Sequence, residues 1–199
     1  MPARSLDELY DEKLLLILDA ERQALDAYPF LVDAVQSREL RDAMRLHMEQ
    51  TERQVERLEA LVGDVTGDKR CIAMTALIEE AQATLGEIED ADTRDAFLIG
   101  AAQAIEHHEI ASYGTACAWA RELGRDEDLT ELEAILAEEK ETDVLLTELA
   151  EGRVNREAAA GEREVALDAA DERAARQERG AARGDLRRER DMEDDAEAR

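Results

Sequence analysis

The sequence predicts an all-α protein: a bundle of four long helices in which the second and third helices are joined by a long crossover. Aromatic residues make up only 3% of the 199 residues, and Pro2 and Pro29 are the only prolines, which favours long helices over sheets. Four long segments repeat apolar residues at alternating steps of three and four, the spacing of a buried helical face. A hydrophobic content of 44% suffices for a packed core.

The first two helices are expected over residues 6–35 and 38–62. Ser37 can cap the second helix, and Pro29 should kink the first one locally. The turn between them is short, so the two helices should run antiparallel. The buried stripe of the second helix is expected to be Met44, Met48, Thr51, Val55, Leu58 and Val62.

The other two helices are expected over residues 93–123 and 126–150, with Gly124 ending the first of them. A shorter helical piece at about residues 71–88 lies within the crossover. Two antiparallel hairpins joined by one long connection have the connectivity of a ferritin-like bundle. The sequence therefore predicts a ferritin-like four-helix bundle with an extra short helix in its crossover.

The composition divides the chain into residues 1–152, which form the bundle, and residues 153–199. The second part has few large apolar residues and carries 11 Arg against 14 acidic residues. Such a segment is expected to be a charged tail that is either disordered or a single helix held by ion pairs.

The chain is strongly acidic, with a formal net charge of −26. Such a surface repels nucleic acid and anionic membranes and attracts cations. It is typical of proteins from a salt-rich cytoplasm, although a genome of high GC content would also enrich acidic codons. The N-terminus lacks an apolar signal core and no run of 18 apolar residues occurs, so a cytoplasmic protein is expected.

Acidic residues lie on or beside the apolar stripes of all four helices. They are Glu21, Glu49, Glu52, Glu106, Glu109, Glu139 and Asp143. A buried carboxylate costs several kcal/mol unless a positive group compensates its charge, and no Lys or Arg lies in these stripes nearby. Counted from the two hairpin turns, the seven positions agree in height within about one helical turn. The pattern predicts a dinuclear metal site at mid-bundle, the alternative being an accidental polar layer in a very acidic chain.

The histidines do not fit the usual pattern of such sites, which places Glu-x-x-His on two helices. Residues 49–52 read Glu-x-x-Glu, and residues 139–142 read Glu-x-x-Thr. His47, His107 and His108 are expected to be peripheral. A site made of oxygen ligands alone binds hard cations well and holds iron or manganese less tightly than one with imidazole.

Several short motifs carry a resemblance to a known family. The strongest is Ile-Glu-His-His-Glu-Ile-Ala-Ser-Tyr-Gly-Thr at 105–115, accompanied by His-Met-Glu-Gln-Thr-Glu at 47–52 and Lys-Arg-Cys-Ile-Ala-Met at 69–74. Over about residues 5–158 the chain resembles the YciE/YciF family of ferritin-like proteins. The resemblance implies a ferritin-like fold, a homodimer, and a stress-associated protein with a di-iron site and a ferroxidase-like role.

The leading functional hypothesis is that the seven acidic side chains bind two iron ions, which O₂ or peroxide oxidises. Tyr113 lies one turn after Glu109 and either hydrogen-bonds a ligand carboxylate, carries an electron, or simply packs in the core. A manganese site with catalase-like activity is one alternative. The other is a non-enzymatic bundle with a structural or interaction role, in which metal is only stabilising or absent.

Overall fold

The structure is a computed structural model that describes residues 3–65, 67, 69–161 and 173. The chain divides into two compact units, Met1–Ala158 and Ala159–Arg199. Most of the expected charged tail, residues 162–172 and 174–199, lies outside the described residues. The account below concerns the first unit.

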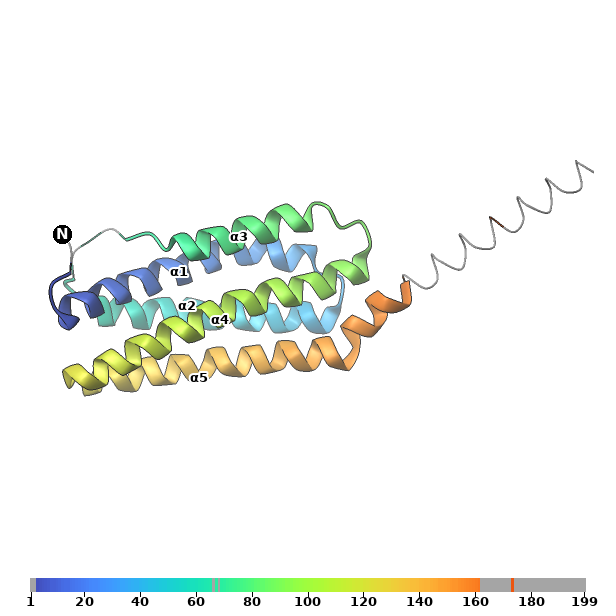
Figure 1. Cartoon of the computed structure of the whole chain (residues 1–199). Coiled ribbons are helices and arrows are strands. Elements are labelled where there is room, and N and C mark those ends of the chain that lie inside the picture. The colour runs from blue at the N-terminus through green and yellow to red at the C-terminus, as the bar shows by residue number, and fades with distance from the viewer. Residues whose placement is uncertain (1–2, 66, 68, 162–172, 174–199) are drawn as a thin grey trace, which may run out of the picture. The chain divides into compact units, whose positions relative to one another are not determined.

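Among the described residues of this unit, five helices and a terminal turn of π-helix are present. They are α1 (Leu6–Ala34), α2 (Arg38–Val62), α3 (Ile72–Leu85), α4 (Ala91–Leu123), α5 (Asp126–Leu149) and η1 (Ala150–Val154). The helix α1 packs against α2, and α4 packs against α5, so that each pair forms a hairpin (Figure 1). The two hairpins contact each other through α1 and α4. The short helix α3 lies in the crossover, against α1 and α4. The predicted all-α, ferritin-like bundle with its long crossover is confirmed.

The helix ends follow from local sequence chemistry. The Ser5 hydroxyl accepts a hydrogen bond from the Glu8 amide (3.1 Å), and the Asp90 carboxylate accepts one from the Thr93 amide (2.7 Å). Each bond satisfies an amide that the first turn of a helix leaves unpaired. Gly124 follows α4 with φ of +68°, the left-handed conformation that glycine adopts without steric cost. None of the helices in the described part of the chain is long and apolar enough to cross a membrane.

A polar clamp holds the turn between α1 and α2. The buried Asp95 carboxylate on α4 accepts hydrogen bonds from the amides of Gln36 (2.8 Å) and Ser37 (2.6 Å). Arg153 in η1 donates to the Ser37 hydroxyl at 3.0 Å. Val154 is buried in the same apolar core as the helices, so the bundle continues past residue 152, where we expected its end. The sequence hid this because one buried valine supplies no periodicity.

The apolar core is not continuous. One cluster includes Met44 from α2, Ile105 from α4 and Leu146 from α5. A second cluster includes Leu58, Tyr113 and Ile135 from the same three helices. Between the two clusters lies a layer of buried polar side chains, which we call the central layer: Glu21, His47, Thr51, Gln54, Glu106, Glu109, Ser112 and Glu139. The helices thus carry polar residues into the bundle at one shared height.

Candidate metal centre

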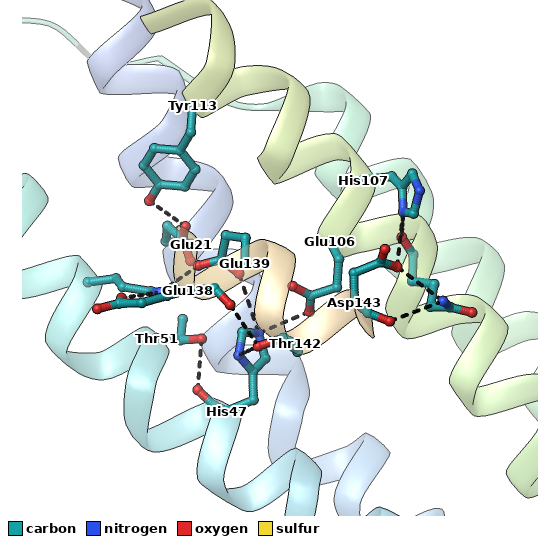
Figure 2. Close-up of polar contacts among 12 residues, drawn as sticks. Glu21, His47, Thr51, Glu106, His107, Tyr113, Glu138, Glu139, Thr142 and Asp143 are labelled. Carbon is teal, nitrogen blue, oxygen red and sulfur yellow. Dashed lines mark hydrogen bonds and ion pairs between the residues drawn. The ribbon is translucent and has the colours of Figure 1, made fainter. Parts of the chain in front are cut away.

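Four potential metal ligands meet in the central layer. They are His47 from α2, Glu106 and Glu109 from α4, and Glu139 from α5. One ligand atom from each lies within 4.8 Å of the corresponding atoms of the others. The two α4 residues share a face because they are three positions apart. Figure 2 shows His47, Glu106 and Glu139 converging from three different helices.

These side chains are buried but incompletely paired. Nε2 of His47, both carboxylate oxygens of Glu106, Oε1 of Glu109 and Oε2 of Glu139 have no hydrogen-bond partner among the described residues. His47 Nε2 lies 3.0 Å from Glu106 Oε1 and 3.8 Å from Glu139 Oε2, without hydrogen-bond geometry. Buried polar atoms nearly always have a hydrogen-bond partner, so five potential ligand atoms without a partner in one place require an explanation.

Glu21 brings a further carboxylate to the layer from α1, with only 1% of its surface exposed. Its Oε1 accepts a 2.6 Å hydrogen bond from the Tyr113 hydroxyl (Figure 2). Burial and the neighbouring carboxylates raise the pKa of Tyr113 well above its usual range, so the phenol stays protonated and donates. Tyr113 therefore fixes the orientation of Glu21.

Burial is the main cause of strongly shifted acidities in this layer. It raises the pKa of Glu21 and of Glu106 to about 8, and that of Glu139 to about 9. The pKa of Glu109 also lies well above its usual range, because of burial and then the charges of Glu21, Glu106 and Glu139. Carboxylates that repel one another in a dry site resist ionisation, and a bound cation would reverse this effect.

Two contacts set the orientation of His47. Its ring meets the Tyr28 ring edge-on, with centroids 5.4 Å apart and an interplanar angle of 82°. Its Nδ1 lies 3.1 Å from Thr142 Oγ1, whose hydroxyl donates to the Glu138 carbonyl at 3.3 Å. The Thr142 oxygen can at the same time accept a hydrogen bond from Nδ1–H. In that tautomer Nε2 carries the lone pair and faces the carboxylates, as in a metal-bound histidine.

Glu139 is held by a chain of polar contacts between α2 and α5. The buried Gln54 amide nitrogen donates to both Glu139 Oε1 and Glu138 Oε2. Arg57 in turn binds both oxygens of Glu138, at 3.0 and 3.1 Å. The second oxygen of Glu139 is among the unpaired atoms. One oxygen is thus positioned by protein, and the other is available to a ligand.

The seven acidic residues predicted for the site are not all in one place. Glu21, Glu106, Glu109 and Glu139 lie in the central layer. Glu49 and Glu52 are on the outer side of α2, where both are exposed. Asp143 lies beside the layer, where its Oδ1 accepts a 3.0 Å hydrogen bond from Gln103. The structure thus does not bring Glu49, Glu52 or Asp143 into the four-residue cluster.

The expectation that His47 would be peripheral is wrong. It is only 5% exposed, because the buried series of α2 is Leu40, Met44, His47, Thr51, Gln54, Leu58 and Val62. The expected stripe had preferred the apolar neighbours Met48 and Val55. Steps of three and four residues also connect Met44, His47, Thr51 and Gln54. This second spacing is the sequence signal that indicates burial of His47 and Gln54. His107, which is exposed and 3.4 Å from Asp143, and His108 lie outside the cluster as expected.

This donor set fits a divalent metal ion. The unpaired atoms of the four candidate ligands are carboxylate oxygens and one imidazole nitrogen, and one ligand atom from each residue lies within 4.8 Å of those of the others. Imidazole beside carboxylate suits iron, manganese and zinc better than oxygen ligands alone do. Ionised, Glu21, Glu106, Glu109 and Glu139 would balance the charge of two divalent cations.

Comparison with known proteins identifies relatives along most of the chain. Residues 5–159 match the family described as a domain of unknown function, DUF892. Protein YciF of Escherichia coli (strain K12) is 38% identical over 162 residues, which cover 79% of this chain and 98% of that protein.

Solved structures show the same fold. The E. coli stress protein YciF superposes with a TM-score of 0.73 at 37% identity, covering 77% of this chain and 99% of that one. YcfI of Rhodopseudomonas palustris, described as a proposed structural protein, gives a TM-score of 0.70 at 37% identity, covering 72% and 94%. The resemblance inferred from the motifs is confirmed: the chain belongs to the DUF892 family and is a relative of the stress protein YciF.

Proposed function

We propose that the central layer binds a pair of divalent metal ions and that the protein oxidises Fe(II) with O₂ or a peroxide. The observation that carries this proposal is the set of five unpaired, buried donor atoms on His47, Glu106, Glu109 and Glu139. Ionising these buried carboxyl groups without a counter-charge is costly, and a bound cation removes that cost. Iron is the substrate here, and a pair of adjacent ions can give two electrons to one oxidant molecule.

The protein's own residues would act through position and charge. Glu106, Glu109 and Glu139 supply carboxylate oxygens, and His47 supplies Nε2. Glu21 completes the charge balance and is kept in place by Tyr113. Because the glutamates are protonated near neutral pH in the empty site, metal binding must release protons. The two apolar clusters on either side shield the layer from water.

The test begins with metal content and Fe(II) oxidation of the purified full chain. Equilibrium dialysis against Fe(II) under argon, followed by addition of O₂ or H₂O₂, measures binding and oxidation separately. We expect about two ions per chain for the wild type. Glu109→Gln should lower both the Fe(II) affinity and the Fe(II) oxidation rate at least tenfold, because the variant replaces a negatively charged ligand of the central layer with a neutral amide.

The matched control is Glu52→Gln, which makes the same change at an exposed position of α2. It should bind and oxidise like the wild type. Equal losses in both variants would mean that overall charge, rather than the central layer, attracts the metal. Unchanged binding and oxidation in Glu109→Gln would end the proposal.

A non-enzymatic role is the second candidate. It is favoured by the description of the R. palustris relative as a proposed structural protein. In that case metal would bind and raise the melting temperature, but Fe(II) would be oxidised no faster than in buffer. Manganese as the resident ion, with catalase-like activity, would appear as H₂O₂ disproportionation by the Mn(II)-loaded protein. The homodimer and the cytoplasmic location stay predictions from the sequence.

A further inference from the structure

A thiol and an imidazole meet outside the central layer. The segment Lys-Arg-Cys-Ile-Ala-Met at 69–74 supplies Cys71, directly before α3, and Ile-Glu-His-His-Glu at 105–109 supplies His108 on α4. Sγ of Cys71 lies 3.3 Å from Nε2 of His108, at hydrogen-bond distance for sulfur. Neither residue belongs to the cluster of candidate metal ligands, and the proposed function uses neither. A nucleophilic side chain in contact with a basic one is the usual arrangement of a reactive thiol.

Contacts with α1 hold the backbone that carries this thiol. The Cys71 amide donates to Asp19 Oδ2 at 2.7 Å, and the Cys71 carbonyl accepts from Gln23 Nε2 at 3.2 Å. Gln23 also donates to the same Asp19 oxygen at 2.5 Å, so two N–H donors offset the charge of this carboxylate. Because both backbone groups of Cys71 are bound, its sulfur is positioned beside His108.

Positive groups gather around the pair although the chain as a whole is acidic. The two residues before Cys71 are Lys and Arg, of which Lys69 is paired with Glu12 at 3.1 Å. Burial and then the charge of Lys13 on α1 lower the pKa of His108, which places a second lysine near the pair. Cys71 is also the N-cap residue of α3, whose first amides are the positive end of the helix dipole. Thiols at helix starts and beside basic side chains are typically reactive.

The position of the pair limits the reagent to a small one. Cys71 is 6% exposed, His108 is half-buried, and Ile72, the residue after Cys71, is 77% exposed. The sulfur thus lies just below the surface, within reach of a molecule little larger than water. Hydrogen peroxide has this size, is uncharged and therefore not repelled by the acidic chain, and oxidises thiols.

Cys117 provides a comparison within the same chain. It is 4% exposed, so the two cysteines are almost equally buried. It lies inside α4, in the apolar cluster that includes Leu58 and Ile135, and burial raises the pKa of its thiol. Cysteines buried in apolar surroundings are inert. A difference in reactivity between the two would thus report their surroundings rather than their exposure.

We propose that Cys71, in contact with His108, is a peroxide-reactive thiol that hydrogen peroxide oxidises to a sulfenic acid. The reaction is Cys-SH + H₂O₂ → Cys-SOH + H₂O. An S–O bond forms and the O–O bond breaks, so sulfur gives two electrons to the peroxide. The thiol proton leaves with the departing hydroxide as water. No metal takes part, and the proposal is independent of the proposed function.

The first experiment treats the full chain, with a chelator present, with about one equivalent of hydrogen peroxide at pH 7. Catalase stops the reaction, and iodoacetamide in guanidinium chloride labels the thiols that remain, which peptide mass spectrometry counts at each cysteine. Cys71 should lose its thiol at least about tenfold faster than Cys117. Equal rates, or a faster loss at Cys117, would overturn the proposal.

The product is identified in the same samples. Dithiothreitol added after catalase should restore the Cys71 thiol, because a sulfenic acid is reducible whereas sulfinic and sulfonic acids are not. A loss of thiol that dithiothreitol does not reverse would exclude sulfenic acid as the product.

The second experiment tests the contact with His108. His108→Ala should slow the oxidation of Cys71 at least about fivefold, because it removes the imidazole from the sulfur. His107→Ala removes the adjacent, exposed histidine, which contacts Gln103 and Asp143 instead, and should leave the rate unchanged. An unchanged or faster rate at Cys71 in folded His108→Ala would contradict the pair.

Folding of the variant is checked in the same measurement. A variant with a loosened fold would lose the Cys117 thiol faster as well, and circular dichroism would show the lost helix. His108→Leu, whose side chain fills more of the space, replaces His108→Ala in that case and should slow Cys71 to the same extent. Oxidation of Cys71 at the wild-type rate in folded His108→Leu would equally overturn the proposal.

Discussion

His47 decides the chemical character of the candidate metal centre. Without it, Glu106, Glu109 and Glu139 would offer only oxygen atoms, which suit magnesium and calcium as well as iron. Its imidazole, oriented by Tyr28 and Thr142, adds a ligand that favours transition metals. We therefore expect the site to prefer iron or manganese over magnesium.

Thr142 should influence metal affinity although it is not itself a candidate ligand. Thr142→Val keeps the shape of the side chain but removes the hydroxyl that lies 3.1 Å from His47 Nδ1 and can hold the ring in its metal-binding tautomer. Loss of such a supporting contact typically lowers metal affinity by about 10- to 100-fold. Competition titration with a chromophoric chelator and Co(II) measures this change.

The control for this substitution is Thr130→Val on the same helix. The Thr130 hydroxyl likewise donates to the carbonyl four residues earlier, but it is exposed, at Asp126 rather than near the central layer. Its replacement should leave the Co(II) affinity unchanged. If both variants bind Co(II) like the wild type, the hydroxyl does not hold His47 in its binding tautomer.

The metal-free protein should become less stable as the pH rises toward 8. Glu21 and Glu106 have a pKa of 4.5 when unfolded and about 8 when folded, so between these values the folded state binds more protons. Stability is then fully present below pH 4.5 and is lost through this window, by at most about 1.4 kcal/mol per group and pH unit. Calorimetric melting temperatures between pH 5 and 8, with a chelator present, measure the trend.

Substitution of one carboxyl group should flatten this dependence. Glu106→Gln removes a titrating group from the layer, whereas Glu52→Gln removes one from the surface. We expect a shallower slope for the first variant and the wild-type slope for the second. A melting temperature that increases steadily from pH 5 to 8 in the wild type would contradict the assigned protonation.

Which acidic residues join the site was only partly predictable at the level of single residues. Glu21, Glu109, Glu139 and Asp143 stood directly on predicted stripes, and the first three are buried whereas Asp143 is only half-buried. Glu49 and Glu52 only flanked a stripe, and in so acidic a chain such positions are usually solvated. Pattern alone cannot separate the two cases, because the burial of a carboxylate depends on neighbouring helices.

At the scale of elements, the helices were largely predictable because their apolar spacing is long and regular. The expected ends of α2, at residues 38 and 62, coincide with those observed, since Ser37 caps one end and Gly63 ends the other. The exact face of α2 was less certain. Apolar Met48 and Val55 beside polar His47 and Gln54 gave two overlapping stripes, and only packing against the neighbouring helices α1 and α5 selects between them.

Replacing Gly100, inside α4, and Gly124, at its C-terminal end, with alanine should change the free energy of unfolding in opposite directions. Gly124 has φ of +68°, so Gly124→Ala should lower the free energy of unfolding by about 1 kcal/mol. Gly100 lies inside α4 with open space where an alanine methyl group would stand, so Gly100→Ala should raise it by about 0.5–1 kcal/mol. Chemical denaturation of both variants measures the difference, and equal effects would contradict the assigned end of α4.

At the scale of the whole molecule, repulsion among acidic side chains should make stability depend on salt. The net charge is −26 for the chain, and residues 1–152 carry 14 Lys and Arg against 37 Asp and Glu, or −23. Salt screens this repulsion, because the Debye length falls from about 10 Å at 0.1 M to about 3 Å at 1 M. We expect the melting temperature to rise by several degrees between about 0.05 and 1 M KCl.

Differential scanning calorimetry at constant pH, with a chelator to exclude metal effects, checks this expectation. Sucrose, which stabilises folded proteins without screening charge, provides the reference. A melting temperature that falls with KCl would indicate that surface ion pairs such as Arg22–Glu59 outweigh the general repulsion.

The interrupted core also has a meaning for how this molecule withstands mutation and heat. The two apolar clusters are separated by the central layer, with its four glutamates and one histidine. Apolar side chains of similar volume in that layer would stabilise the packing of the helices more. An engineered chain with leucine in place of these four glutamates and phenylalanine in place of the imidazole should outlast the natural one on heating, yet capture no cation. If the proposed function holds, the central layer lowers the heat stability of the bundle in return for a metal site.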